Sequence, residues 1–140
     1  MSVYVVDASV AAKWVFEETH TAEALRLFDD GNRLHAPDFL LIELDSVVCK
    51  RIRQGQVSGD LGRQVRATLR QFPVQHHPFL PLLDPAFEIA SRTPCSVYDC
   101  LYVALAAVLD GQMVTADGRL HDLLAEGPFA RQVLWVGDLA

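Results

Sequence analysis

Residues 96–111 read SVYDCLYVALAAVLDG, and this segment carries the strongest helix signal in the sequence. From Ser96 to Asp110 it predicts a helix whose apolar side chains lie nearly all round, and helices of that kind are buried. Ser96 is a favourable residue before a helix, and Gly111 is a favourable terminator. We therefore expect this helix to lie buried at the centre of the molecule.

Short strands alternate with helices on both sides of this central helix. The expected strands are Val3–Val6, Leu34–Ala36, residues 74–79, Met113–Thr115 and Val133–Val136. Three further helices are expected at residues 8–16, from Ser58 to about Phe72, and at Gly118–Ala125. Three more are expected to begin at capping residues: one at Thr21 that ends at Gly31, one at Asp38 that ends near Gly55, and one at Asp84 with Pro85 as its first residue. This order predicts an α/β fold with a parallel sheet and helices on both faces.

Length and composition indicate a single domain over residues 1–140. The net charge is −6, which excludes a generally basic nucleic-acid coat, so that contact with RNA needs a local patch or a metal. Three cysteines without close spacing favour a reduced, cytoplasmic protein. No targeting segment or apolar run long enough for a membrane span is apparent.

Three acids are expected to meet at one edge of the sheet. Asp7 follows the first strand, Asp117 follows Met113–Thr115, and Asp99 opens the central helix. Singly, each is typical of a helix cap or first-turn acid. Together, carboxylates at one edge repel one another, and a divalent cation is the usual compensation. Oxygen ligands without His or Cys favour Mg²⁺ or Mn²⁺.

A fourth acid lies in the helix that starts at Asp38, where helical phase leaves two interpretations open. Glu43 shares a face with Ser46, Lys50 and Arg53, while Asp45 falls on the apolar face. Periodicity alone makes Glu43 a solvated residue and Asp45 the unusual one. Alternatively, the Glu43 face lines a polar groove in which Lys50 and Arg53 meet phosphates.

Four segments together resemble the PIN-domain family, and most closely its VapC-type toxin ribonucleases. The segments are VVDASV at residues 5–10, APDFLLIE at 36–43, VYDCLYVALA at 97–106 and VTADGRL at 114–120. The resemblance implies a three-layer α/β/α sandwich around a mostly parallel sheet. It also implies that Asp7, Glu43, Asp99 and Asp117 are the catalytic, metal-binding acids, with Ser9 and Thr115 lining the site.

The sequence departs from the family pattern at two positions. Ser46 stands where the family often has Asn, and Asp45 stands at a position that is usually small or apolar. Because serine cannot supply an amide donor, we expect Ser46 to alter how the substrate is positioned. Basic residues are candidates for RNA contact: Lys50 and Arg53, and a stripe of Arg63, Arg66 and Arg70 that equally fits a solvated helix face. Lys13 is expected at the surface.

The function implied by the resemblance is a Mg²⁺- or Mn²⁺-dependent endoribonuclease, the toxin of a type II toxin–antitoxin pair. The implied partners are RNA, a VapB-type antitoxin and a second copy of the chain. Two alternatives remain at this point. One is a catalytically silent PIN scaffold that binds RNA or protein. The other is an aspartate-dependent phosphatase, which usually carries Asp-x-Asp where this sequence has Asp7-Ala8-Ser9.

Overall fold

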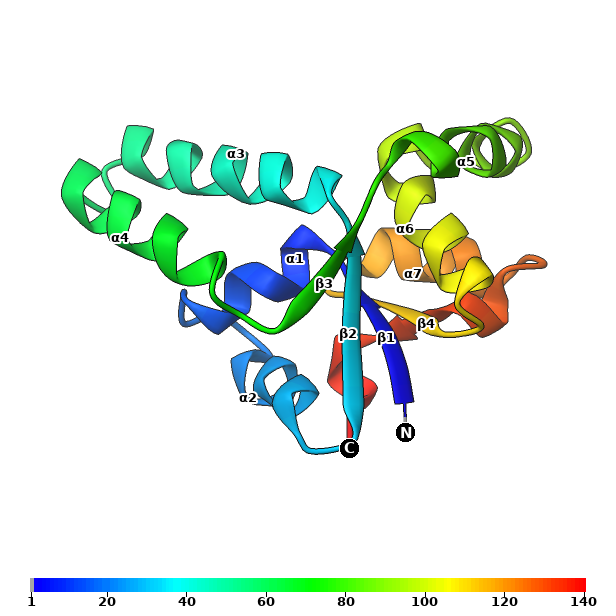
Figure 1. Cartoon of the computed structure of the whole chain (residues 1–140), viewed down its shortest axis with the longest axis horizontal. Coiled ribbons are helices and arrows are strands. Elements are labelled where there is room, and N and C mark those ends of the chain that lie inside the picture. Colours follow the sequence, from blue (N-terminus) through cyan, green and yellow to red (C-terminus); the bar gives the residue numbers. More distant parts are fainter. Residues whose placement is uncertain (1) are drawn as a thin grey trace.

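A five-stranded parallel sheet forms the centre of the computed structural model, which describes residues 2–140 (Figure 1). Its strands are β1 (Ser2–Val6), β2 (Asn32–Pro37), β3 (Val74–His77), β4 (Gln112–Thr115) and β5 (Val133–Trp135). Their order across the sheet is β3-β2-β1-β4-β5, and all four pairings are parallel. The predicted parallel sheet is confirmed.

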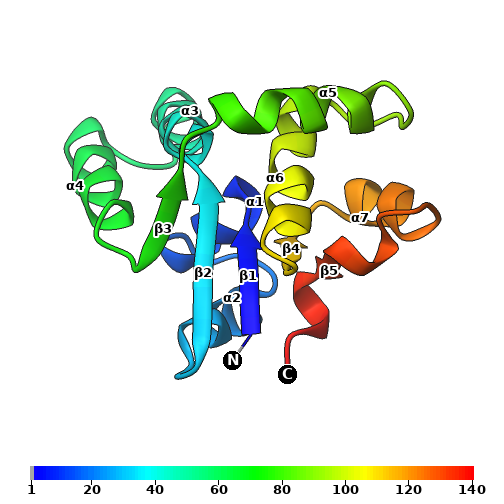
Figure 2. The ribbon, with the colours of Figure 1, turned by 45° about the vertical axis from the view of Figure 1, so that its right-hand side comes forward.

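Helices connect the strands and form the two outer layers. They are α1 (Ala8–Ala11), α2 (Thr21–Leu25), α3 (Phe39–Arg53), α4 (Gly59–Leu69), α5 (Leu83–Ala90), α6 (Val97–Val108) and α7 (Gly118–Ala125). Because parallel crossovers are right-handed, the helices after β1 and β2 lie on one face and those after β3 and β4 lie on the other. Figure 2 shows α1 and α2 behind the sheet, with α6 on the opposite side. The predicted α/β sandwich is therefore confirmed.

The core lies between α6 and the middle strands. Val5 and Val6 are completely buried, which agrees with a strand covered on both faces. Every residue from Cys100 to Ala106 is buried, and α6 packs against β1, β2 and β4. The prediction of a buried central helix is correct, although its last residue, Val108, reaches solvent. Among residues 2–140, no helix combines the length and apolar character needed to cross a bilayer.

The chain reverses its direction across the sheet at β1. It first moves outward from β1 to β2 and β3, and then returns to place β4 on the other side of β1. In open α/β sheets, such a switch point leaves a crevice at the carboxyl ends of the two strands concerned. Asp7 and Asp117 follow β1 and β4, so both stand at this switch point.

Three predicted helix caps are wrong. The residue before α2 is His20, with a left-handed φ of 68°, and the Thr21 hydroxyl instead accepts from the Glu18 amide. Asp38 precedes α3, but its side chain does not cap that helix. Its carboxylate instead accepts a hydrogen bond from the amide of Phe79, which follows β3 in the sequence. Asp84 lies inside the first turn of α5, since a 3₁₀ turn at Leu80–Leu82 runs directly into that helix. Caps at Ser58 and Ser96 are confirmed.

The first helix is shorter than predicted, and this buries a residue expected at the surface. α1 ends at Ala11 and continues as a 3₁₀ turn at Ala12–Trp14. Lys13 is buried and its ammonium group lies 3.2 Å from Glu18, which also pairs with Arg51 of α3. The expectation that Lys13 lies at the surface is therefore wrong, because an acid further along the chain neutralises it.

Candidate active site

Asp7 directly follows β1 and is the most completely buried acid of the candidate site, with 6% of its surface exposed. Its Oδ1 atom accepts from the Ser9 hydroxyl at 2.6 Å and from the Val10 amide at 3.0 Å. Its Oδ2 atom accepts from the Thr115 hydroxyl at 2.6 Å. Asp7 therefore caps α1, as one interpretation required, and the carboxylate is also held in a fixed orientation by two hydroxyl groups.

Ser9 and Thr115 join Asp7 to the loop that carries Asp117. The Ser9 hydroxyl accepts from the Ala116 amide at 3.0 Å while donating to Asp7. The Thr115 hydroxyl accepts from the Asp117 amide at 3.1 Å while donating to the other oxygen of Asp7. Each hydroxyl thus uses its donor and an acceptor position, and together they fix the β4–α7 loop beside β1.

Asp117 and Asp99 lie beside a hollow between α6 and α7. Asp117 is exposed and caps α7, since its Oδ1 atom accepts from the Leu120 amide at 3.1 Å. Asp99 lies in the first turn of α6, where its amide donates to the Ser96 hydroxyl. The two acids and Arg119 line a hollow of about 180 Å³ between α6 and α7.

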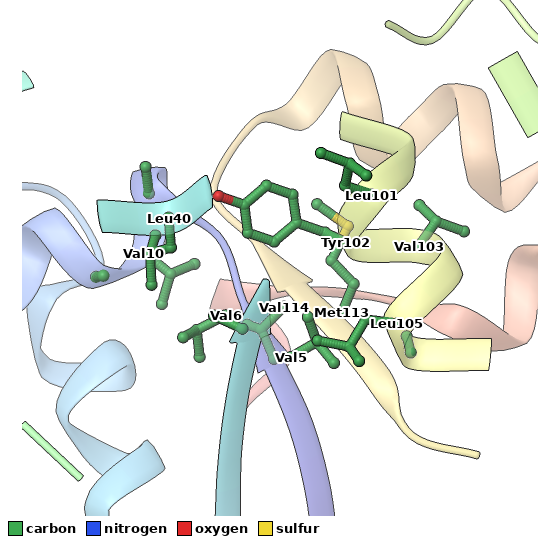
Figure 3. Close-up of a cluster of buried hydrophobic side chains, with 14 of the residues drawn as sticks. Val5, Val6, Val10, Leu40, Leu101, Tyr102, Val103, Leu105, Met113 and Val114 are labelled. Atoms are coloured by element: carbon green, nitrogen blue, oxygen red, sulfur yellow. The ribbon is translucent and has the colours of Figure 1, made fainter. Parts of the chain in front are cut away.

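Glu43 reaches the site from α3 and is held by a residue that the sequence did not single out. The hydroxyl of Tyr102 on α6 donates to Glu43 Oε1. Tyr102 is 1% exposed, and Figure 3 shows its hydroxyl pointing away from α6 toward Leu40 and Val10. Glu43 is therefore not a solvated surface residue. Helical spacing could have identified Tyr102, because it lies one turn after Asp99.

The four acids influence one another electrostatically. Burial, with a smaller contribution from the charge of Asp99, raises the pKa of Asp7 from 3.8 to about 6 despite its hydrogen bonds. Burial raises the pKa of Glu43, and the charges of Asp7 and Asp99 add to this. Burial also raises the pKa of Asp99, with a contribution from Asp117. These three pKa values are raised by burial and by neighbouring carboxylates, and only hydrogen bonds oppose the rise.

A divalent cation fits this donor set, provided that water completes its coordination. Within residues 2–140, no three His, Cys, Asp or Glu side chains gather closely enough to hold an ion directly. Mg²⁺ keeps several of its waters and is commonly held through one or two carboxylates. A buried carboxylate with a raised pKa, coupled to other carboxylates, would gain from a hard cation bound in this way.

The remaining candidates of α3 separate into two groups. Ser46 and Lys50 line a hollow beside Glu43, whereas Arg53 is exposed beyond it. Asp45 faces α4, where Arg66 donates to both of its oxygens at 2.6 and 2.9 Å and Arg70 lies at 3.8 Å. The unusual acid on the apolar face is thus explained by an ion pair between the two helices.

The arginine stripe of α4 forms ion pairs with acids of the same chain. Arg66 and Arg70 face Asp45, and Arg63 lies 3.5 Å from Asp60. Arg66 and Arg70 are thus already paired with Asp45, whereas Arg63 and Asp60 are both largely exposed and fit a solvated face. A single helix pattern could not reveal this, because Asp45 lies on another helix.

Comparison with known proteins places this chain in a family. Residues 4–124 match the family described as PIN domain. Ribonuclease VapC3 from Pyrobaculum aerophilum is 30% identical over 120 residues, which cover 84% of this chain and 92% of that protein. The chain therefore belongs to the PIN-domain family, as a member of its VapC type.

Solved structures agree with this assignment at the level of the fold. The crystal structure of PAE2754 from Pyrobaculum aerophilum superposes with a TM-score of 0.72 at 21% identity, covering 99% of this chain and 92% of that one. A toxin–antitoxin complex from Klebsiella pneumoniae gives a TM-score of 0.61 at 12% identity, with 96% of each chain covered.

Proposed function

We propose that this chain is the toxin endoribonuclease of a toxin–antitoxin pair and that it hydrolyses RNA phosphodiester bonds with the help of Mg²⁺ or Mn²⁺. The observation that carries the proposal is the group of four acids at the switch point of the sheet, three of them with pKa values raised by burial and by one another. The VapC ribonuclease relative supports the reaction. In a protein that only binds RNA, such a group of acids would repel the phosphates of the RNA.

The metal is assigned to the carboxylates. Asp7, Asp99 and Asp117 would hold it directly or through water, with water completing the coordination, and Glu43 would contribute from α3. When bound, the ion neutralises charge on the scissile phosphate and makes water a better nucleophile at neutral pH. Since the protein carries a net charge of −6, the ion also supplies the local positive charge that draws the phosphate to the site.

The side chains around the metal orient the reacting groups. Glu43, held by the Tyr102 hydroxyl, is placed to accept a hydrogen bond from the attacking water and then its proton. Ser9 and Thr115 keep the Asp7 carboxylate fixed. Ser46, Lys50 and Arg53 lie along α3 beyond Glu43 and are assigned to positioning the RNA backbone.

The partners follow from the same assignment. A VapB-type antitoxin covers the site, which is supported by a toxin–antitoxin complex that shares the fold. A homodimer is supported by large apolar side chains left in solvent, of which Leu80 and Val108 are the most exposed. The site of action is the cytoplasm, where RNA is available. Sedimentation of the purified chain tests the dimer.

Expression of the chain without an antitoxin tests the function. Growth should arrest, and Asp99→Asn should relieve the arrest, because the variant loses a negative charge but keeps its size and the hydrogen bond that its backbone amide donates to the Ser96 hydroxyl. Asp122→Asn is the matched control, since Asp122 is an exposed acid of α7 outside the cluster. Equal toxicity of Asp99→Asn at equal protein level would contradict the catalytic assignment.

A further inference from the structure

A hollow of about 460 Å³ opens beside Glu43, between α3 and the start of α6. Its walls include Phe39, Ile42, Ser46, Lys50 and Tyr98, together with Glu43. Two of these residues are sequence neighbours of the acids, because Ile42 precedes Glu43 and Tyr98 precedes Asp99. Because Glu43 itself lines the hollow, a molecule there lies against one of the four acids.

One wall of the hollow is a stacked pair of aromatic rings. The ring centroids of Phe39 and Tyr98 are 5.3 Å apart, and the rings are inclined by only 15°. Tyr98 is 61% exposed, and so is Ile42. Such a wall offers a flat apolar surface to solvent, and flat aromatic rings are the surfaces on which unpaired nucleobases stack.

At the other end of the hollow, Lys50 carries a positive charge that no side chain in the described part of the chain pairs with. Within residues 2–140, the ammonium group of Lys50 has neither a hydrogen bond nor an ion pair, although Arg51, the next residue, pairs with Glu18. Lys50 lies two helical turns beyond Glu43 on the same face of α3. A phosphate next to a base in the hollow would meet this charge.

We propose that the hollow is a nucleotide subsite, in which one unpaired base of the RNA stacks on Tyr98 while an adjacent phosphate contacts Lys50. This inference rests on the proposed function, because a scissile phosphate at the acids brings a neighbouring nucleotide to the surface beside Glu43. The subsite selects single-stranded RNA, since a base within a duplex cannot leave its stack without cost.

Kinetics with total bacterial RNA as the probe test the stack. Tyr98→Ala should raise the apparent KM about 5- to 150-fold, which corresponds to the stacking energy of one base. The value of kcat should change little, because the base is stacked both before and during cleavage. Tyr98→Phe should restore the wild-type KM, since it keeps the ring. Phe87→Ala is the matched control, because Phe87 is 59% exposed on α5 and lies outside the hollow.

Photocrosslinking locates the base independently of cleavage. Short single-stranded RNAs containing 5-iodouridine are irradiated with the wild-type chain in EDTA, and the linked residue is identified by mass spectrometry. The expected site is Tyr98 or Phe39, and Lys50→Ala should lower the yield and weaken its dependence on salt. Crosslinks only elsewhere, or none, would overturn the subsite.

The outcomes separate the subsite from the proposed function. If the wild type cleaves RNA and Tyr98→Ala cleaves it with unchanged KM, the subsite is wrong while the ribonuclease stands. If Tyr98→Ala instead loses only its binding to an antitoxin, the hollow accepts a protein segment, and the nucleotide assignment is overturned. If the wild type cleaves no RNA at all, the proposed function fails and the subsite fails with it.

Discussion

Two acids on the same helix have opposite surroundings. Asp45 faces α4, where hydrogen bonds from Arg66 hold the pKa of this carboxyl below its usual value. Glu43, two residues earlier, faces the strand ends, where burial raises its pKa and the charges of Asp7 and Asp99 add to the effect. Arginines of α4 thus offset the charge of Asp45, whereas only the hydrogen bond from Tyr102 opposes the raised pKa of Glu43.

The two regions therefore serve different purposes: one stabilises the fold and the other is suited to binding a ligand. The ion pairs of Asp45 are complete within the chain and contribute modestly to stability, since they are partly exposed. The acids at the strand ends destabilise the metal-free protein, because burial and mutual repulsion disfavour their charged forms. A fold that retains such a cluster gains from it through a ligand, and a divalent cation has the matching charge.

The largest expected effect separates the two acids of α3. Glu43→Gln should lower RNA cleavage by about 100-fold or more, because it removes a carboxylate of the metal site, and should leave the melting temperature equal or higher. Asp45→Asn should keep cleavage near the wild-type level and cost less than about 1 kcal/mol of stability. Cleavage assays and melting curves on both variants measure this. The reverse pattern would make Asp45 the functional acid.

The pH dependence of stability tests the buried charge of Asp7. Because burial raises the folded-state pKa of Asp7 above its unfolded value, folding favours the protonated form, and this contribution to stability is lost as pH rises from about 4 to about 6. In EDTA, Asp7→Asn should therefore gain about 2 kcal/mol relative to wild type between pH 4 and pH 7. Denaturant unfolding at several pH values measures it, and a constant difference would contradict the burial argument.

A smaller effect is expected from the residue that holds Glu43. Tyr102→Phe should lower kcat about 10-fold, because residues that orient metal-site groups typically contribute this much, and should leave KM nearly unchanged. The aromatic ring and its packing remain, so the fold should persist. The control is Tyr98→Phe, which removes a hydroxyl from the same helix without touching Glu43. Unchanged cleavage by Tyr102→Phe would show that the bond to Glu43 has no catalytic role.

Much of the fold could be predicted because its signals are local. The buried helix at residues 97–108, the helix at residues 118–125 and the alternation of strands and helices depend on nearby residues, and all are confirmed. The predicted caps at Asp38 and Asp84 are wrong, since in each case another segment decides what the carboxylate or the start of the helix does. The prediction that Lys13 lies at the surface is wrong for the same reason, because its partner Glu18 comes close to it only when the loop folds.

The same distinction between local signals and contacts with other segments applies to the candidate site. The positions of Asp7 and Asp117 follow from the rule that parallel strands end at one edge, and the structure places both there. The phase of one helix could not decide between Glu43 and Asp45, because the deciding groups, Tyr102 and Arg66, lie on other helices. The functional roles of the acids stay predictions until variants are measured.

The most direct test of the metal site is thermal melting with and without Mn²⁺ for the wild type and Asp7→Asn. Asn caps a helix about as well as Asp, so in EDTA the variant should melt at or above the wild-type temperature. Mn²⁺ at 100 times its dissociation constant should stabilise the wild type by about 2.7 kcal/mol and the variant by little. If the wild type shows no gain, or if Asp7→Asn gains as much and melts well below wild type in EDTA, then Asp7 is a structural cap and the metal site is wrong.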